Sequence, residues 1–154
     1  MIEKRLVTDW MATTLAAATH MPVGDGRAPI TGQPPPFHLL YSVDTSVSGA
    51  PYADLNEDAS LVYQITHVSG PDPSIAQSTA DLDQLEWMAD KTRKAFLARN
   101  PGTGLWLNPL TVPGISCMRR SLDIEWGAQP GGTSEQEAAI MTYVQRFRFD
   151  LTPA

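Results

Sequence analysis

The sequence is poor in the residues on which small disulfide-bonded and nucleic-acid-binding proteins depend. It contains one cysteine, Cys117, so it cannot form a disulfide within the chain. This cysteine lies in an alternating apolar run, which favours a buried, unreactive thiol. Basic residues number 11 against 17 acidic ones, for a net charge of −6. A nucleic-acid-binding surface normally shows a basic patch, so this balance argues against one; it suits a surface to which DNA must not attach.

Long hydrophobic runs are also absent. No apolar stretch approaches the length of a membrane span, and Asp9 interrupts the only candidate for a secretory signal. We therefore expect a chain of a reducing, cytosolic compartment. At 154 residues the chain suits one domain over residues 1–154. A domain of this size buries roughly 68–70% of its unfolded surface, so it needs no disulfide or metal to fold.

Recognisable catalytic and metal-binding motifs are missing as well. His20, His38 and His67 lack a metal-ligand spacing, and the glycines do not form a phosphate-binding loop or a nucleophile elbow. His67 shares strand parity with Tyr63 and Ile65, which favours a hydrogen-bonded, partly buried histidine. The acidic run around Asp58 lacks the central glycine and final glutamate of a calcium loop. We predict a protein that is not an enzyme, with no catalytic residue, cofactor or metal.

Two segments have helical periodicity and four alternate like strands. The helical segments are residues 2–18 and a segment that begins between Ser74 and Thr79 and ends near Arg99. The strand segments are residues 36–43, 61–68, 115–126 and 139–152. Residues 21–36, 44–60 and 127–138 are expected to be long loops. The pattern predicts an α+β fold: a mainly antiparallel four-stranded sheet with two principal helices packed on one face.

The last two strands carry charged residues at alternating positions. The first of them is expected to place four apolar residues on one face: Met118, Leu122, Ile124 and Trp126. Asp123 and Glu125 then share the other face. Arg146 and Arg148 share a face of the last strand and would pair with these carboxylates if the two strands are neighbours. That ordinary cross-strand pairing is favoured over a phosphate site.

One aromatic residue lies on the wrong side of the second helix. Its apolar stripe consists of Leu85, Met88, Ala89, Ala95 and Phe96. Trp87 points away from this stripe, among Asp83, Lys91 and Lys94. Two interpretations remain: a local cation–π contact with Lys91, four residues later, or an anchor for another chain.

Five features give the chain a resemblance to a known family. They are an amphipathic opening helix, PPPFHLLYSV (34–43), YADLNEDASLVYQITHVSG (52–70), QLEWMADKTRKAFL (84–97) and YVQRFRFDLTP (143–153). In these features the chain resembles the tail terminator proteins of long non-contractile-tailed bacteriophages, the lambda-type minor tail protein U group, and especially members from actinobacteriophages. It departs from them in a longer segment between the last two strands, and in RRSLD (119–123), which replaces a more acidic run.

The resemblance implies a structural virion protein. Tail terminators form homohexameric rings that cap the tail tube, end its polymerisation and provide the joint to the head connector. The implied partners are other copies of the chain, the tail tube protein and the head–tail connector protein, with no membrane involved. DNA passes through the channel without sequence-specific binding. The implied location is the head–tail junction of the virion, after assembly in the host cytoplasm.

Contact residues are expected in two places. On a ring of this kind we expect Trp87, Lys91 and Lys94 to form a lateral subunit interface, and the hairpin tip at Gly131 and Gly132 to contact the tube or the connector. Two alternatives stay open: another connector or tail-completion protein, and a small-molecule-binding or catalytic α+β domain in which His38 and His67 line a pocket.

Overall fold

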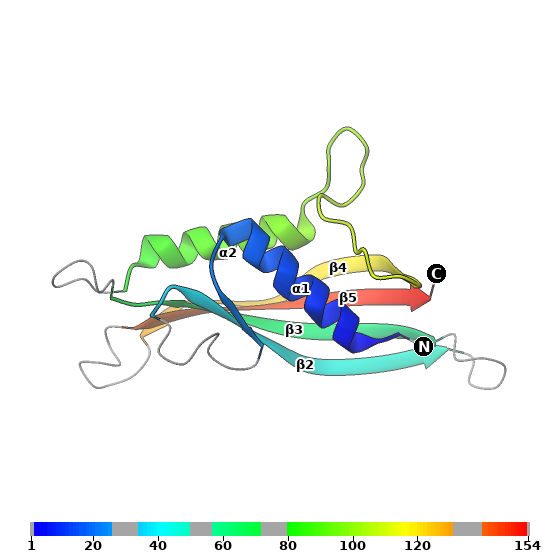
Figure 1. The fold of residues 1–154 in the computed structure, drawn as a ribbon, viewed down its shortest axis with the longest axis horizontal. Coiled ribbons are helices and arrows are strands. Elements are labelled where there is room, and N and C mark those ends of the chain that lie inside the picture. Colours follow the sequence, from blue (N-terminus) through cyan, green and yellow to red (C-terminus); the bar gives the residue numbers. More distant parts are fainter. Residues whose placement is uncertain (1, 26–33, 50–56, 72–79, 131–139, 154) are drawn as a thin grey trace.

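Two helices cover one face of a five-stranded sheet in the computed structural model, which describes residues 2–25, 34–49, 57–71, 80–130 and 140–153 (Figure 1). The helices are α1 (Lys4–Thr19) and α2 (Leu82–Leu97). The strands are β1 (Val23–Asp25), β2 (Phe37–Gly49), β3 (Glu57–Ser69), β4 (Ile115–Pro130) and β5 (Met141–Pro153). Their order across the sheet is β1-β2-β3-β5-β4, with β1 parallel to β2 and the other neighbours antiparallel.

The α+β class is confirmed, but the prediction of a four-stranded antiparallel sheet is wrong. The fifth strand, β1, has three residues inside a segment rich in proline and glycine, so it is too short to show a periodicity. β2 and β3 also run further than predicted, since residues 44–49 and 57–60 pair with each other instead of forming a loop. Side chains 41–47 of β2 are all exposed, so no burial on either face imposes an apolar alternation there.

The helix termini follow ordinary capping chemistry. α1 ends at His20, which has a left-handed φ of 57° and whose backbone N–H donates to the carbonyl of Ala16. α2 begins later than predicted, after Asp81, whose carboxylate accepts from the backbone N–H of Asp83 at 2.9 Å. The predicted start, between Ser74 and Thr79, falls in 72–79, outside the described residues.

The core lies between the helices and the sheet. The stripe of α1 formed by Val7, Met11 and Leu15 is fully buried. Phe96 of α2 packs against Phe147 and Phe149 of β5, with ring centroids 5.5 and 6.0 Å apart. Burying one side chain of this size contributes about 1.5–3 kcal/mol, so this one-sided core is the main source of stability.

Bulges in β4 change which face each of its side chains occupies. The register with β5 shifts at three places, one of them between Leu122 and Ile124. Leu122 therefore packs on the helix-covered face opposite Phe147, whereas Ile124 and Trp126 lie on the uncovered face. The prediction of a common face for these three residues is wrong, because the extra residue of a bulge reverses the alternation.

The predicted ion pairs between β4 and β5 are wrong for the same reason. Glu125 turns toward the helices and accepts from Arg93 of α2 at 2.8 Å. On the uncovered face Arg146 stacks on Trp126, 5.0 Å from the ring centroid, and Arg148 pairs with Asp150 at 3.2 Å. The two arginines are thus satisfied without Asp123, which is exposed.

Two histidines meet inside the sheet–helix interface. Nδ1 of His38 lies 2.7 Å from Nδ1 of His67, and neither side chain is exposed. Nε2 of His38 lies 2.8 Å from the hydroxyl of Thr19, while Nε2 of His67 lies 2.7 Å from Oε1 of Gln145. The Gln145 amide in turn donates to Glu125 at 2.7 Å. A continuous polar chain therefore runs from α1 through β2, β3 and β5 to β4.

For each hydrogen bond in this series, the geometry indicates which group donates the proton. The amide of Gln145 donates to Glu125 and to the carbonyl of Ala89, so its oxygen must accept a proton from Nε2 of His67. A neutral His67 then accepts from Nδ1 of His38. Nε2 of a neutral His38 accepts from the hydroxyl of Thr19, whose single hydrogen is then directed to the ring and not to the carbonyl of Leu15, 3.0 Å from the same oxygen. Both histidines are satisfied in their neutral forms, and they line no described pocket.

Burial disfavours a charge on either ring. Burial, and after it electrostatic repulsion from His67, lowers the pKa of His38 to about 3. Burial also lowers the pKa of His67 to about 4, against the opposing effects of the Gln145 hydrogen bond and the Glu125 charge. In the unfolded chain both histidines take up protons near pH 6.5. Unfolding therefore binds protons, and stability falls as the pH drops below about 6.5.

We predict that the free energy of unfolding decreases by about 2 to 3 kcal/mol between pH 7.5 and pH 5.5, a window above the titration of most carboxylates. Denaturant unfolding at the two pH values measures it. His67→Gln, which cannot titrate, should lose half or more of this pH dependence, whereas His20→Asn at the exposed α1 cap should retain it. A wild-type stability that does not change over this window would contradict the neutral pair.

Candidate subunit interface

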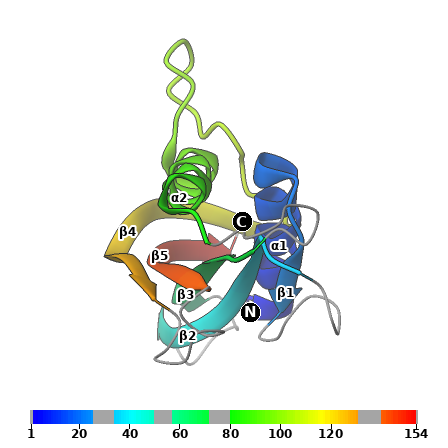
Figure 2. The same cartoon turned by 90° about the vertical axis from the view of Figure 1, so that its left-hand side faces the viewer.

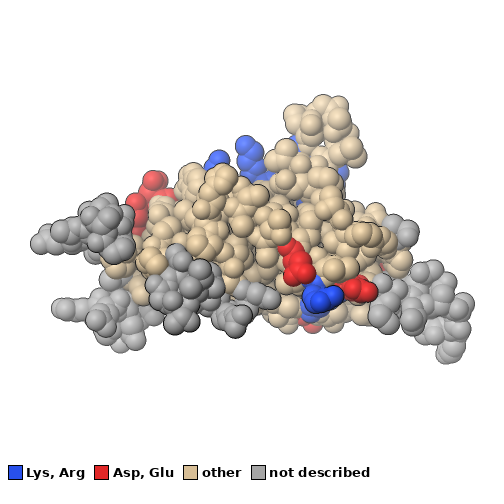
Figure 3. Space-filling view, in the orientation of Figure 1, with Lys and Arg blue, Asp and Glu red and all other residues tan. Residues whose placement is uncertain are grey.

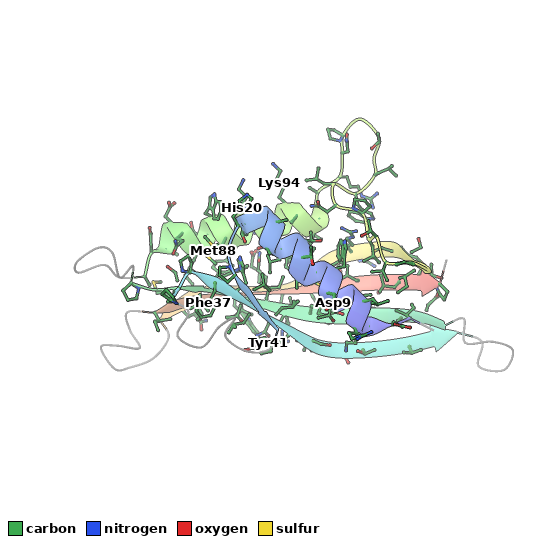
Figure 4. The ribbon with its side chains drawn as sticks, in the orientation of Figure 1. Asp9, His20, Phe37, Tyr41, Met88 and Lys94 are labelled. Atoms are coloured by element: carbon green, nitrogen blue, oxygen red, sulfur yellow. The ribbon has the colours of Figure 1, made fainter. Side chains whose placement is uncertain are left out.

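The outer side of α2 carries the three residues predicted for a lateral contact. Trp87 is 42% exposed, and Lys91 and Lys94 are exposed beside it. Figure 4 shows Lys94 on the side of α2 that points away from the sheet, where Figure 3 shows a group of basic side chains. The Nζ of Lys91 lies 5.7 Å from the centroid of Trp87. The local cation–π contact is therefore present, yet it leaves much of the indole in water.

The second predicted contact, at Gly131 and Gly132, lies outside the described residues. Its flanks are described, since Pro130 at the end of β4 pairs with Met141 at the start of β5.

A hairpin that the sequence did not reveal rises from the end of α2. Residues 98–107, here called the projecting hairpin, extend away from the sheet on the helix side (Figures 1 and 2). Arg99 bridges to Trp106, and the backbone N–H of Asn100 donates to the carbonyl of Leu105 at 2.7 Å. Leu105 is 68% and Leu107 46% exposed. Two large apolar side chains on an ordered projection are a typical contact element.

A stack of alternating aromatic and guanidinium groups attaches this hairpin to the core. The guanidinium of Arg120 on β4 lies 5.1 Å from the ring centroid of Trp10 and 4.5 Å from that of Trp106. Arg99 covers the outer side of Trp106 at 3.9 Å. Arg120 is buried and donates through Nη1 to the carbonyl of Phe96. Among the described residues its Nε and Nη2 have no hydrogen-bond partner, so aromatic faces stabilise the charge. Burial lowers the pKa of Arg120.

The sequence contains only a short segment that indicates the projecting hairpin. The apolar tripeptide Leu105–Trp106–Leu107 follows the breaker Asn100-Pro101-Gly102, and three residues are too few to separate a hairpin from a loop. The partner of Trp106, Arg120, lies far along the chain and looks like one of several strand arginines.

The described part of the chain shows no arrangement typical of catalysis. A depression of about 320 Å³ on the uncovered face is lined by Ser46, Asp58, Ala59, Ser60, Met118, Arg119, Arg148 and Asp150. Two of its four charged residues pair with each other: Asp150 accepts from Arg148 at 3.2 Å, and it also accepts from the hydroxyl of Ser60 at 2.7 Å. Cys117 is a half-buried free thiol. Within the described ranges we found no group of three or more His, Cys, Asp or Glu placed to hold a metal, and no helix long and apolar enough to span a bilayer.

No protein-family model and no curated protein matches this sequence.

We predict that Arg120→Ala loosens the projecting hairpin, because Trp106 then loses one of its two stacking partners and the link to Trp10. Limited proteolysis should cut within residues 98–107 at least several-fold faster than in the wild type. Arg119→Ala is the matched control, since it removes an exposed arginine from the adjacent position. Equal cleavage rates for Arg120→Ala and Arg119→Ala would contradict the anchoring role of the stack.

Proposed function

We propose that this chain is a tail terminator of a long non-contractile-tailed bacteriophage. In this role it forms a homohexameric ring on the end of the completed tail tube, stops further polymerisation and provides the joint to the head connector. DNA passes through the ring without sequence-specific contacts. The protein acts as a structural component of the virion and not as an enzyme.

The distribution of exposed apolar side chains carries this proposal. Large apolar side chains are exposed in four separate places: Trp87 on α2, Leu105 and Leu107 on the projecting hairpin, Val47 on β2 and Met118 on β4. A ring subunit needs two different lateral surfaces, and surfaces toward the tube and the connector. Scattered contact surfaces suit that requirement, whereas a small-molecule binder concentrates its contacts in one concave site.

The sequence resemblance supports the same role. The motifs behind it correspond to described elements: the opening helix is α1, the proline-rich approach leads into β2, the tryptophan-bearing helix is α2, and the closing aromatic strand is β5. The net charge of −6 is compatible with a channel through which DNA slides. Another connector or tail-completion protein of the same junction remains the nearest alternative.

The small-molecule-binding alternative depends on two histidines as pocket residues, and the structure buries both. His38 and His67 are fully buried and hydrogen-bonded to each other, so they are unavailable to a ligand.

We predict that Trp87→Ala weakens self-association while preserving the fold. An anchor indole buried at an interface contributes about 2 kcal/mol or more, which corresponds to a loss of roughly 30-fold in association. Light scattering as a function of concentration measures the association, and growth of tail tubes in the presence of each protein measures capping. The wild type should stop tube growth at concentrations at which Trp87→Ala does not.

Leu82→Ala is the matched control, because Leu82 is 48% exposed on the same helix but about 140° around its axis from Trp87. Its association should stay close to that of the wild type. A large fall in the melting temperature of Trp87→Ala would show that the indole supports the core and would exclude it as an anchor. A wild type that leaves tube growth unaffected would contradict the proposed function itself.

A further inference from the structure

One edge of the sheet is only half covered. The short strand β1 pairs with residues 38–40 of β2, and in the described ranges no strand pairs with β2 on that side beyond Leu40. From Tyr41 to Val47 every side chain is exposed. Asp44 is the single charge between Tyr41 and Gly49, and neither proline nor lysine interrupts this segment. Natural proteins protect edge strands with such residues and with bulges. The bulge of β2 lies between Ser42 and Asp44, so the regular run from Thr45 to Gly49 carries neither device and is free to pair with another strand.

The opposite edge of the sheet is β4. Its accessible part lies at the same position along the strand direction, here called the same height, as the free part of β2. The strand register links Val47 of β2 through Ala59 and Leu151 to Cys117 of β4, in one row across the sheet. A second row runs from Ser46 through Ser60 and Asp150 to Arg119. The free part of β2 and residues 115–121 of β4 therefore lie at the same end of the sheet, on its two opposite edges.

The strand directions make these two edges compatible. β2, β3, β5 and β4 alternate in direction, because each pair of neighbours is antiparallel. If β4 of another copy lies beside β2, the alternation continues without interruption. The contact is then an antiparallel strand pair, in which the bulge of β4 between Cys117 and Arg119 interrupts the hydrogen-bond ladder locally.

We propose that residues 41–49 of β2 pair with residues 115–121 of β4 in the next copy of this chain, so that the sheet continues across the subunit boundary. This inference rests on the proposed ring and adds a lateral contact between strands to the one expected at Trp87. The contact is heterologous, since it joins two different edges. Because both edges lie at the same height, repeating the contact produces no advance along the strand direction, which is the condition for a closed ring instead of a filament.

The side chains at the two edges complement each other. Val47, on the helix side of the β2 edge, is 52% exposed, and Met118, which lines the depression on the uncovered face beside the β4 edge, is 53% exposed. On the uncovered face Asp44 is the acidic residue of the β2 edge and Arg119 the basic residue of the β4 edge. In an antiparallel pair such residues meet directly or diagonally.

Disulfide trapping tests this pairing with the natural Cys117 as one partner. Val47 and Cys117 both lie on the helix side of the sheet, opposite Ala59 and Leu151 respectively. Cross-strand pairs of this kind bring Cα atoms within the roughly 4.4–6.8 Å that a disulfide requires. The Val47→Cys variant is assembled and then oxidised, so that a disulfide to Cys117 of the next copy can form. Thr45→Cys tests in the same way a pairing shifted by two residues. The expected result is a ladder of covalent multimers that ends at the ring size.

Two controls make the result specific. Ser46→Cys places a thiol on the uncovered face, away from Cys117, and should give at least several-fold less cross-linking. Cys117→Ser in the Val47→Cys background should abolish the ladder. Ser46 and Val47 are exposed, so variants at these positions should have the melting temperature of the wild type, whereas Thr45→Cys also removes the hydrogen bond from Lys4.

Other outcomes overturn the inference. Dimers that persist in the Cys117→Ser background would show that β2 pairs with β2 of a second copy. In a second outcome the wild type assembles and caps tubes, but neither Val47→Cys nor Thr45→Cys gives a ladder. This would show that the ring uses other surfaces, and the proposed function would stand. A wild type that neither assembles nor caps tubes would refute the proposed function, and the proposed edge pairing with it.

Discussion

One-sided burial is the constraint on which the rest of this structure depends. α1 and α2 cover a single face of the sheet, and the apolar side chains of the helices and the sheet meet there. The same face holds the series of hydrogen bonds through His38 and His67, which both rings satisfy in their neutral forms. The opposite face and both edges of the sheet stay exposed. A domain organised in this way is stable alone and still offers several surfaces for assembly.

The sequence predicted those parts of the fold in which burial imposes a period. The stripes of α1 and α2, and the alternation of β3 and β5, were recognised because one side of each faces the core. Where burial does not act, the prediction failed: β1 is three residues long, and Tyr41–Val47 of β2 is exposed on both sides. The bulges of β4 were missed because the extra residue at each bulge reverses the alternation.

The candidate contact residues differ in how well the sequence alone predicts them. Trp87 was recognisable because a large apolar residue off the buried stripe of a helix is conspicuous. Leu105 and Leu107 were not, since the projecting hairpin depends on the stack of Trp106 between Arg99 and Arg120, a contact between distant parts of the chain. The relation between the β2 and β4 edges follows only from the strand order, which local patterns do not contain.

The central claim is that this chain assembles into a closed ring through different surfaces on its two sides. The most direct measurement is the native mass of the purified protein by light scattering, with and without tail tubes, together with negative-stain images of the large species. The account predicts six-subunit particles with a central hole, free in solution or on the tube end. A monomer that stays a monomer when tubes are present, or an open filament in place of a ring, would contradict it.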